Sequence, residues 1–312
     1  MEAPKVCILL AAYNGREYIR QMIDSVLAQD YGNIRLILSD DGSQDGTGQI
    51  LEEYAQNEPE RVILYRSGTR FGCAQYHFLH LLSRFQDEQY IMFCDQDDVW
   101  HRDKVRKTLA KMQKLEAGMD IPAMVHTDLR VVDADLRLIS PSFWNYSKLD
   151  GKRLALNQLL VQNTVTGCTM MINRSLARCV CSAIPEEGIL MHDWWIALLA
   201  SVCGRADALN EATMDYRQHG NNGVGAKEVR SVRYLWQRLT GEGMQRRMSG
   251  NKVQAQLLLK HHAGKLNADQ KTLISAFIKA QESPWPVRNF LYIRYGLLKY
   301  GFIRIAAQLL GF

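Results

Sequence analysis

Residues 90–98 read YIMFCDQDD, an uninterrupted apolar run that ends in a cluster of carboxylates. A short, continuous apolar run is typical of a buried strand in a parallel sheet. The same pattern occurs twice earlier, since residues 6–14 read VCILLAAYN and residues 34–43 read IRLILSDDGS. Each run therefore predicts a strand that is followed at once by polar side chains.

The segments between these runs have the spacing of helices. Apolar residues between the first two runs follow the i, i+3, i+4, i+7, i+8 spacing of one helix face. They are Ile19, Met22, Ile23, Val26 and Leu27. A further strand is expected at residues 62–65. Strands that alternate with helices predict an α/β fold whose central sheet is mostly parallel and flanked by helices.

The chain has 312 residues, with 38 Lys+Arg, 33 Asp+Glu, a formal net charge of +5 and a hydrophobic content of 47%. These are values of a globular protein, so a disordered or collagen-like chain is excluded. The charge is unevenly distributed: residues 226–312 hold fifteen Lys+Arg and four Asp+Glu (+11), and residues 1–225 hold 23 and 29 (−6). The sequence GNNGVG at 220–225 is typical of a loop. We therefore expect one domain at 1–225 and a basic, mainly helical region at 226–312.

The middle third is less regular. Strands are expected at residues 124–132 and 167–172, and the apolar run at 194–202 predicts a buried helix.

The acidic cluster at Asp95, Asp97 and Asp98 suggests a bound cation. Grouped carboxylates repel one another, and a Mg²⁺ or Mn²⁺ ion held together with phosphate oxygens relieves that repulsion. The alternative is that Asp98 caps the helix expected at 102–114.

Ligands bind open α/β sheets beyond the carboxyl ends of the strands. The chain has no G-x-x-x-x-G-K-[ST] loop, and Gly46-Thr47-Gly48 is only a fragment of a dinucleotide fingerprint. A nucleotide at this edge must then be held by a metal and by stacking. Tyr13 offers an aromatic face, and Asp41 offers an acceptor for a base N–H.

Together these motifs resemble family 2 glycosyltransferases of the Rossmann-like GT-A fold. The resemblance rests on Ala12-Tyr13-Asn14-Gly15, on Ser39-Asp40-Asp41-Gly42-Ser43 and on Asp95-Gln96-Asp97-Asp98-Val99-Trp100. It extends over residues 5–225 and includes the later segments NTVTGCTMMIN at 163–173, MHDWW at 191–195 and YRQHGNN at 216–222. This combination is most similar to bacterial rhamnosyltransferase-like members, which build surface polysaccharides from dTDP-L-rhamnose.

The resemblance implies an inverting, metal-dependent transfer and a role for each matching residue. It implies contacts with the nucleotide-sugar from Ala12, Tyr13, Asn14, Asp41, Asp95, Gln96 and Asp98. It implies a Mg²⁺ or Mn²⁺ ion on Asp95, Asp97 and His219. Asp193 matches the general base, and this chain has His192 before it where many members have Glu. The expected acceptor contacts are Gly167, His192, Trp194 and Trp195.

Each of these roles has a structural alternative. Asp193 precedes an apolar run and can cap a helix, His219 can be a surface histidine, and Trp194 and Trp195 can belong to the core. Gly167 can bring backbone close to a substrate, or it can lie in an ordinary strand.

The C-terminal region suggests a membrane surface. After Pro284 and Pro286, the basic residues Arg288, Arg294, Lys299 and Arg304 stand among aromatic and aliphatic residues, with no acid. This composition favours attachment to anionic lipid. The alternative is a helical appendage that packs on the catalytic domain with a solvated basic face. No motif supports nucleic-acid binding.

The location follows from what the sequence lacks. It has no signal-peptide pattern and no apolar stretch of the ~18–20 residues that a membrane-spanning helix needs. Its seven cysteines are irregularly spaced, which indicates a reducing compartment. We therefore expect a cytoplasmic enzyme that can attach to the inner face of the cell membrane. The sequence gives no indication of the oligomeric state.

The expected partners are a nucleotide-diphosphate sugar donor and a saccharide or lipid-linked acceptor. A UDP-hexose donor is the first alternative to dTDP-L-rhamnose. A nucleotidyltransferase is a second, although such enzymes carry a Gly-rich early loop that residues 12–16 lack. A non-catalytic nucleotide-sugar-binding subunit is a third, and the retained Asp95, Asp97 and Asp193 argue against it.

Overall fold

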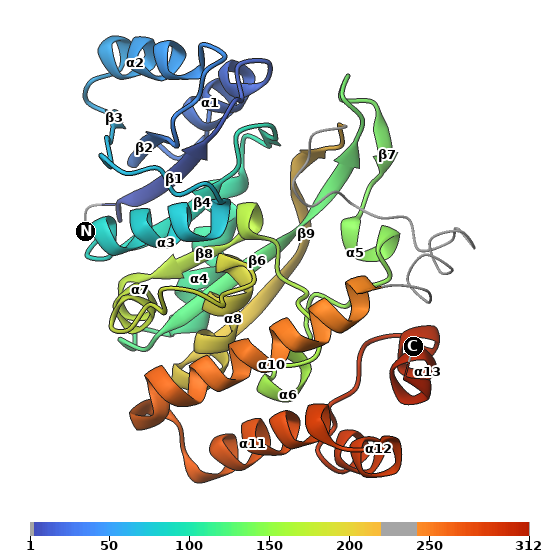
Figure 1. Cartoon of the computed structure of the whole chain (residues 1–312). Coiled ribbons are helices and arrows are strands. Elements are labelled where there is room, and N and C mark those ends of the chain that lie inside the picture. The colour runs from blue at the N-terminus through green and yellow to red at the C-terminus, as the bar shows by residue number, and fades with distance from the viewer. Residues whose placement is uncertain (1–2, 220–241, 312) are drawn as a thin grey trace.

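A computed structural model of the chain describes residues 3–219 and 242–311 (Figure 1). The boundary expected at 220–225 lies outside the described residues, so the division into two domains stays a prediction.

The described strands form one sheet with the order β3-β2-β1-β4-β8-β6-β9-β5, and β7 pairs with β6. They are β1 (Val6–Ala12), β2 (Ile34–Asp40), β3 (Val62–Leu64), β4 (Tyr90–Cys94), β5 (Val99–Trp100), β6 (Ala123–Val132), β7 (Leu138–Ser140), β8 (Met171–Asn173) and β9 (Arg205–Arg217). Strands β3, β2, β1 and β4 are parallel neighbours, as are β6 and β9, and β8 runs antiparallel between β4 and β6. The predicted α/β fold with a mostly parallel central sheet is confirmed.

Helices cover both faces of this sheet (Figure 1). In the N-terminal and middle parts they are α1 (Ile19–Leu27), α2 (Thr47–Asn57), α3 (Ala74–Phe85), α4 (Lys104–Glu116), α5 (Phe143–Tyr146), α6 (Leu156–Leu159), η1 (Gly167–Thr169), α7 (Arg174–Cys181) and α8 (His192–Cys203). Successive residues of β1 point to opposite faces. Cys7 and Leu9 pack with α3, α7 and α8, whereas Ile8 and Leu10 pack with α1, α2 and α4.

Two segments differ from the expected pattern. The strand expected at 167–172 is mostly a 3₁₀ turn, because the N–H of Met170 donates to the carbonyl of Gly167 before the chain enters β8. The long strand β9 is not marked in the sequence by an uninterrupted apolar run, because polar and charged residues recur along it.

The described part of the C-terminal region, residues 242–311, is helical, as expected, and packs on the side of the sheet that α8 covers. It contains α10 (Glu242–His262), η2 (Ala263–Lys265), α11 (Ala268–Glu282), α12 (Trp285–Arg294) and α13 (Phe302–Leu310). Ala255, Phe277 and Tyr292 belong to the same hydrophobic core as Trp195 of α8. Among the described residues, we find no helix that is both long and apolar enough to cross a membrane.

Candidate active site

The acidic loop lies between β4 and β5, next to the end of β1. The Tyr13 N–H donates to Oε1 of Gln96 (2.8 Å), and Nε2 of Gln96 donates back to the Tyr13 carbonyl (3.0 Å). Gly15 makes this contact possible, because a Cβ at this position would lie 2.3 Å from Oε1 of Gln96. The pair of hydrogen bonds fixes the strand ends of β1 and β4 relative to each other.

The end of β2 joins the same cluster. The Asn14 N–H donates to the Ser43 hydroxyl (2.8 Å), and the Gly15 N–H donates to the Thr47 hydroxyl (2.9 Å). The three polar strand ends that the sequence marks therefore meet at one edge of the sheet.

The carboxylate of Asp41 is buried and holds the loop between β3 and α3. Its oxygens accept hydrogen bonds from the N–H groups of Phe71 (2.6 Å) and Gly72 (2.7 Å). Through this loop Asp41 positions Arg70, whose guanidinium lies 5.1 Å from the ring centre of Tyr13 and donates to its hydroxyl (2.7 Å). Arg70 has no signal in the sequence, because its partner is 57 residues away.

His219 and Asp97 lie in contact, since Nε2 of the imidazole is 2.7 Å from Oδ2 of the carboxylate. Both side chains are mostly buried, with exposed fractions of 14% and 16%. The ring of Tyr18 lies 5.0 Å from that of His219. The structure thus brings together two of the three residues expected to bind a metal.

Arg217 fixes this arrangement, and sequence reasoning missed it. Its N–H donates to Oδ1 of Asp98 (3.1 Å), and its Nε donates to the carbonyl of Asp97 (2.8 Å). Its guanidinium also donates to Gln21 and stacks 4.5 Å from the ring centre of Tyr18. Because Asp98 accepts from Arg217, it does not cap α4, whose N-cap residue is Asp103.

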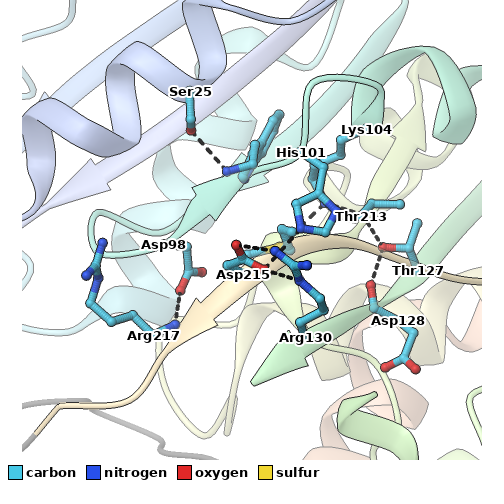
Figure 2. A network of polar contacts seen from close by, with 12 residues as sticks. Ser25, Asp98, His101, Lys104, Thr127, Asp128, Arg130, Thr213, Asp215 and Arg217 are labelled. Atoms are coloured by element: carbon cyan, nitrogen blue, oxygen red, sulfur yellow. Dashed lines mark hydrogen bonds and ion pairs between the residues drawn. The ribbon is translucent and has the colours of Figure 1, made fainter. Parts of the chain in front are cut away.

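The end of β9 is held by the polar network that Figure 2 shows. Asp215 accepts from Nε of Arg130 (2.5 Å) and lies 3.0 Å from Nε2 of His101. Burial alone would raise the pKa of Asp215, but these two partners bring it down to about 2. Beside it, the fully buried Lys104 donates to the Thr213 hydroxyl (3.1 Å).

The donor atoms of the acidic loop suit a hard divalent cation. Ligand atoms of Asp95, Asp98 and Cys168 lie within 4.8 Å of one another. Burial, and then the charges of Asp97 and Asp193, raise the pKa of Asp95, so this carboxylate lacks a compensating positive charge. Burial also raises the pKa of the Cys168 thiol far above its usual range. A thiol is a softer ligand than a carboxylate and suits Mg²⁺ or Mn²⁺ less well. Carboxylate oxygens are the ligands that Mg²⁺ and Mn²⁺ prefer.

Asp193 lies in the first turn of α8 and is 7% exposed. Its Oδ1 accepts from Nδ2 of Asn163 (3.1 Å), and its Oδ2 accepts from the N–H of Gly167 (3.0 Å). Burial raises the pKa of Asp193 to about 6 in spite of these donors. The N-cap residue of α8 is Met191, so Asp193 is not the N-cap, although its Oδ1 also accepts the N–H of Trp194 in the first turn of the helix.

The expected acceptor residues divide into two groups. Gly167 and Trp194 lie beside Asp193, and the half-buried indole of Trp194 donates to the carbonyl of Leu159 (2.7 Å). Trp195 is fully buried and packs 5.7 Å from the ring of His262, so the expectation that it contacts an acceptor is wrong.

His192 also faces inward and is 3% exposed. Its ring centre lies 4.3 Å from that of Phe78 and 5.4 Å from that of Phe93. A Cβ at Gly167 would lie 2.6 Å from its Nε2, so the absence of a side chain at Gly167 makes room for this ring. The structure therefore places His192 in the core, between Gly167 and the rings of Phe78 and Phe93, rather than on a surface that an acceptor could reach.

Comparison with known proteins gives consistent matches. A sequence model described as "Glycosyl transferase family 2" matches residues 7–181. The chain is 27% identical over 247 residues to the dTDP-rhamnosyl transferase RfbG of Shigella flexneri. The aligned part is 73% of this chain and 81% of that protein. It is 25% identical over 237 residues to the putative teichuronic acid biosynthesis glycosyltransferase TuaG of Bacillus subtilis (strain 168). That alignment includes 75% of this chain and 86% of the Bacillus protein.

Two solved structures resemble the fold. The TarS 1–349 fragment of S. aureus in complex with UDP-GlcNAc has a TM-score of 0.60 at 16% identity, over 89% of this chain and 72% of that one. The mannosyltransferase PcManGT of Pyrobaculum calidifontis in complex with GDP-Man and Mn²⁺ has a TM-score of 0.57 at 19% identity, over 99% and 79%. At these identities the likeness shows the fold, which is the one expected from the sequence.

Proposed function

The chain belongs to glycosyl transferase family 2 and is a glycosyltransferase of the GT-A fold, and from this premise we propose that it transfers a sugar from a nucleotide diphosphate to an acceptor hydroxyl in one inverting step. The observation that carries this proposal is the position of Asp193. Its carboxylate is oriented by Asn163 and Gly167, and its pKa of about 6 leaves it ionised at neutral pH yet basic enough to accept a proton.

The proposed reaction requires proton removal at the acceptor and stabilisation of negative charge at the donor. On the acceptor side, Asp193 takes the hydroxyl proton as the oxygen attacks the anomeric carbon. On the donor side, the nucleoside diphosphate leaves with its negative charge, and Arg70, stacked on Tyr13, adds positive charge at the nucleotide end. Asn163 and the Gly167 N–H keep the base oriented, so little reorganisation is needed when the proton moves.

Asp95, Asp97 and Asp98 are the residues that would hold a divalent cation, and His219 would hold the Asp97 carboxylate or join the ion directly. When bound, Mg²⁺ or Mn²⁺ supplies charge neutralisation for the leaving diphosphate. The protein's own part is to keep these carboxylates together against their repulsion. Arg217 holds the loop that carries them, because its backbone N–H donates to Oδ1 of Asp98 and its Nε donates to the Asp97 carbonyl.

We propose dTDP-L-rhamnose as the donor. Support comes from the similarity to the Shigella protein that is named a dTDP-rhamnosyl transferase. The alternative is a UDP-hexose, because the S. aureus structure of the same fold contains UDP-GlcNAc. In either case the proposal places the base beside Tyr13 and Arg70, and Asp41 holds the loop that carries Arg70 through the N–H groups of Phe71 and Gly72.

We further propose that the acceptor is a growing bacterial surface polysaccharide, free or linked to lipid. The names of the Shigella and Bacillus relatives support this class of product. In this proposal residues 1–225 are the catalytic domain, and residues 226–312 attach the enzyme to the cytoplasmic face of the membrane.

The exposed surface of α12 and α13 supports attachment. Fourteen large apolar side chains are exposed among the described residues, and eight of them lie between 285 and 310. They are Trp285, Val287, Phe290, Ile293, Tyr300, Phe302, Ile303 and Leu310. Arg288, Arg294, Lys299 and Arg304 lie in the same segment, which has no acid. Of these four basic residues, Arg294 is exposed and the other three are half-buried. Exposed apolar side chains in a basic segment match the chemistry of an anionic bilayer.

Packing on the catalytic domain does not compete with this role. Nη2 of Arg304 donates to the Ser147 carbonyl (2.6 Å), and the Tyr300 N–H donates to Oε1 of Gln162 (2.8 Å). These bonds fix α13 to the α5–α6 region while its other face stays exposed.

A donor screen tests the proposed reaction. The full chain is incubated with dTDP-L-rhamnose, UDP-glucose, UDP-GlcNAc and GDP-mannose, each with Mn²⁺ and with EDTA, and its melting temperature is measured. We expect the largest stabilisation with dTDP-L-rhamnose and Mn²⁺. A larger shift with a UDP-sugar identifies the alternative donor, and no shift with any nucleotide-sugar contradicts the proposal.

A further inference from the structure

A cavity of about 480 Å³ lies away from the acidic loop, where the last turns of α7 and α8 meet η2. Helix α7 begins next to Tyr90, the first residue of β4, whereas the acidic loop follows the last residue of that strand. Two thiols, of Cys179 and Cys203, line this cavity together with Lys265. The proposed transfer reaction uses none of these three groups.

The two thiols are neighbours in the lining of this cavity, and a cation faces one of them. The side chains of Cys179 and Cys203 are close enough to interact as hydrogen-bond partners. Nζ of Lys265 lies 3.5 Å from Sγ of Cys179. The same ammonium donates to the Cys179 carbonyl (3.2 Å) and to the Ser182 hydroxyl (2.7 Å), so it is held in place beside the sulfur.

This surrounding favours a thiolate at Cys179. The hydrogen bond from Cys203, and then the charge of Lys265, lower the pKa of the Cys179 thiol, although burial opposes them. The interaction with Cys179, and then burial, raise the pKa of the Cys203 thiol. Two residues away, burial raises the pKa of the Cys181 thiol to about 12. One of three neighbouring thiols is thus selectively activated.

We propose that Cys179 and Cys203 form a reactive dithiol site, in which Cys179 is the nucleophile toward a small hydroperoxide and Cys203 resolves the product. The cavity gives a small molecule access to sulfurs that are otherwise largely covered, since Cys179 is 8% exposed. Two neighbouring thiols, one of them facing a fixed ammonium, are an arrangement that favours two-electron oxidation.

The proposed oxidation takes place in two displacement steps. In the first, the Cys179 thiolate attacks one peroxide oxygen, the O–O bond breaks, and the other oxygen leaves with a proton as water or an alcohol. The product is the sulfenic acid of Cys179. In the second, the Cys203 sulfur attacks that of Cys179, the S–O bond breaks, and hydroxide leaves with the Cys203 proton as water. Two electrons pass from the sulfurs to the hydroperoxide, and a disulfide remains.

The disulfide would join the last turn of α7 to the last residue of α8. Helix α8 carries Asp193 in its first turn, so oxidation ties down the far end of the helix that holds the proposed base.

Thiol reactivity in the reduced full chain tests the site without reference to transfer activity. The protein is treated with limiting iodoacetamide at pH 7, and each cysteine is quantified by peptide mass spectrometry. We expect alkylation of Cys179 to be at least about tenfold faster than that of Cys73, a partly exposed cysteine outside the cavity. Lys265→Gln should slow labelling of Cys179 severalfold, and Lys271→Gln, which removes an exposed lysine on α11, should not.

Oxidation tests the second step. With stoichiometric hydrogen peroxide, we expect a Cys179–Cys203 disulfide peptide and the loss of two hydrogens from the protein mass. In Cys203→Ser, the sulfenic acid of Cys179 should instead accumulate and be trapped by dimedone. The proposal is overturned if Cys179 is labelled no faster than Cys73, or if peroxide modifies both sulfurs without linking them.

Discussion

The imidazole of His219 and the carboxylate of Asp97 lie 2.7 Å apart although 122 residues separate them in the sequence. The contact joins the residues after β9 to the acidic loop after β4. Two residues before His219, Arg217 bonds to the backbone of Asp97 and to the carboxylate of Asp98. The end of β9 therefore determines where the proposed metal ligands stand.

The first prediction concerns the proposed metal ligand. In the unaltered protein we expect Mn²⁺ to raise the affinity for dTDP or UDP at least about tenfold, or ~1.4 kcal/mol. Asp97→Ala should remove this gain, because the variant loses a hard oxygen ligand and the partner of His219. Isothermal titration with and without Mn²⁺ measures both affinities. Asp135→Ala, at a surface carboxylate that is 67% exposed, should keep the gain. Equal affinity of the unaltered protein with and without metal would contradict the assignment.

The second prediction concerns Asp193 as the base. Asp193→Asn should keep donor affinity and lose about 10²–10⁴-fold in kcat, since the amide cannot accept the acceptor proton. The unaltered enzyme should show kcat rising with pH through about 6, because the carboxyl must be ionised and its pKa is about 6. Steady-state rates between pH 5 and 8 at saturating donor test both. Near-normal turnover of the variant would exclude the base assignment.

The free energy of unfolding of Asp193→Asn shows whether its loss of kcat is due to misfolding. Because the pKa of Asp193 is higher in the folded protein than in the unfolded chain, ionisation costs folding free energy, and that cost grows as pH rises from about 4 to 6. Asp193→Asn removes an ionised group from a buried position. The amide has one acceptor oxygen for two donors, Asn163 and the Gly167 N–H, and this offsets part of the gain. The free energy of unfolding of the variant at pH 7, measured in urea, should therefore stay close to that of the unaltered protein.

The third prediction concerns Arg217. This side chain is 3% exposed, and its guanidinium donates to Gln21 and to the Asp97 carbonyl. Arg217→Met should lower the free energy of unfolding by about 2–4 kcal/mol, because it removes charged hydrogen bonds and leaves buried acceptors unpaired. Arg137→Met, at an exposed arginine, should change it by no more than about 0.5 kcal/mol. Urea unfolding measures both variants. A change in Arg217→Met as small as that of the control would show that the β9 end is held by other contacts.

The sequence was sufficient to predict the strand ends, because apolar runs and the polar residues after them are adjacent along the chain. Tyr13, Asp41 and Asp95 were found in this way. Arg70 and Arg217 were not, because their roles depend on partners 57 and 120 residues away, and no local pattern records such a pairing.

The residues expected to bind the acceptor show a second limit of prediction from the sequence. His192 and Trp195 are expected at the acceptor because they belong to the motif MHDWW, which contains Asp193. Consecutive helical residues point about 100° apart, so neighbours of a site residue commonly face the core. In α8 this rotation places His192 against Phe78 and buries Trp195 completely. Sequence proximity to a catalytic position is thus weak support for contact with substrate.

The last prediction concerns the surface of α12 and α13. The full chain should co-sediment with vesicles that contain phosphatidylglycerol and bind far less to pure phosphatidylcholine, since each basic residue near an anionic surface contributes about 1 kcal/mol. Phe302→Ser with Ile303→Ser should reduce binding severalfold, because these side chains are 86% and 59% exposed on α13 and are free to enter the bilayer interface. Leu138→Ser with Ile139→Ser is a matched control, since this pair on β7 is also exposed (57% and 47%) but lies outside the basic segment. If the α13 variant binds vesicles as well as the control, the exposed face of α13 does not contact lipid. The C-terminal helices would then serve only to complete the core that they share with α8.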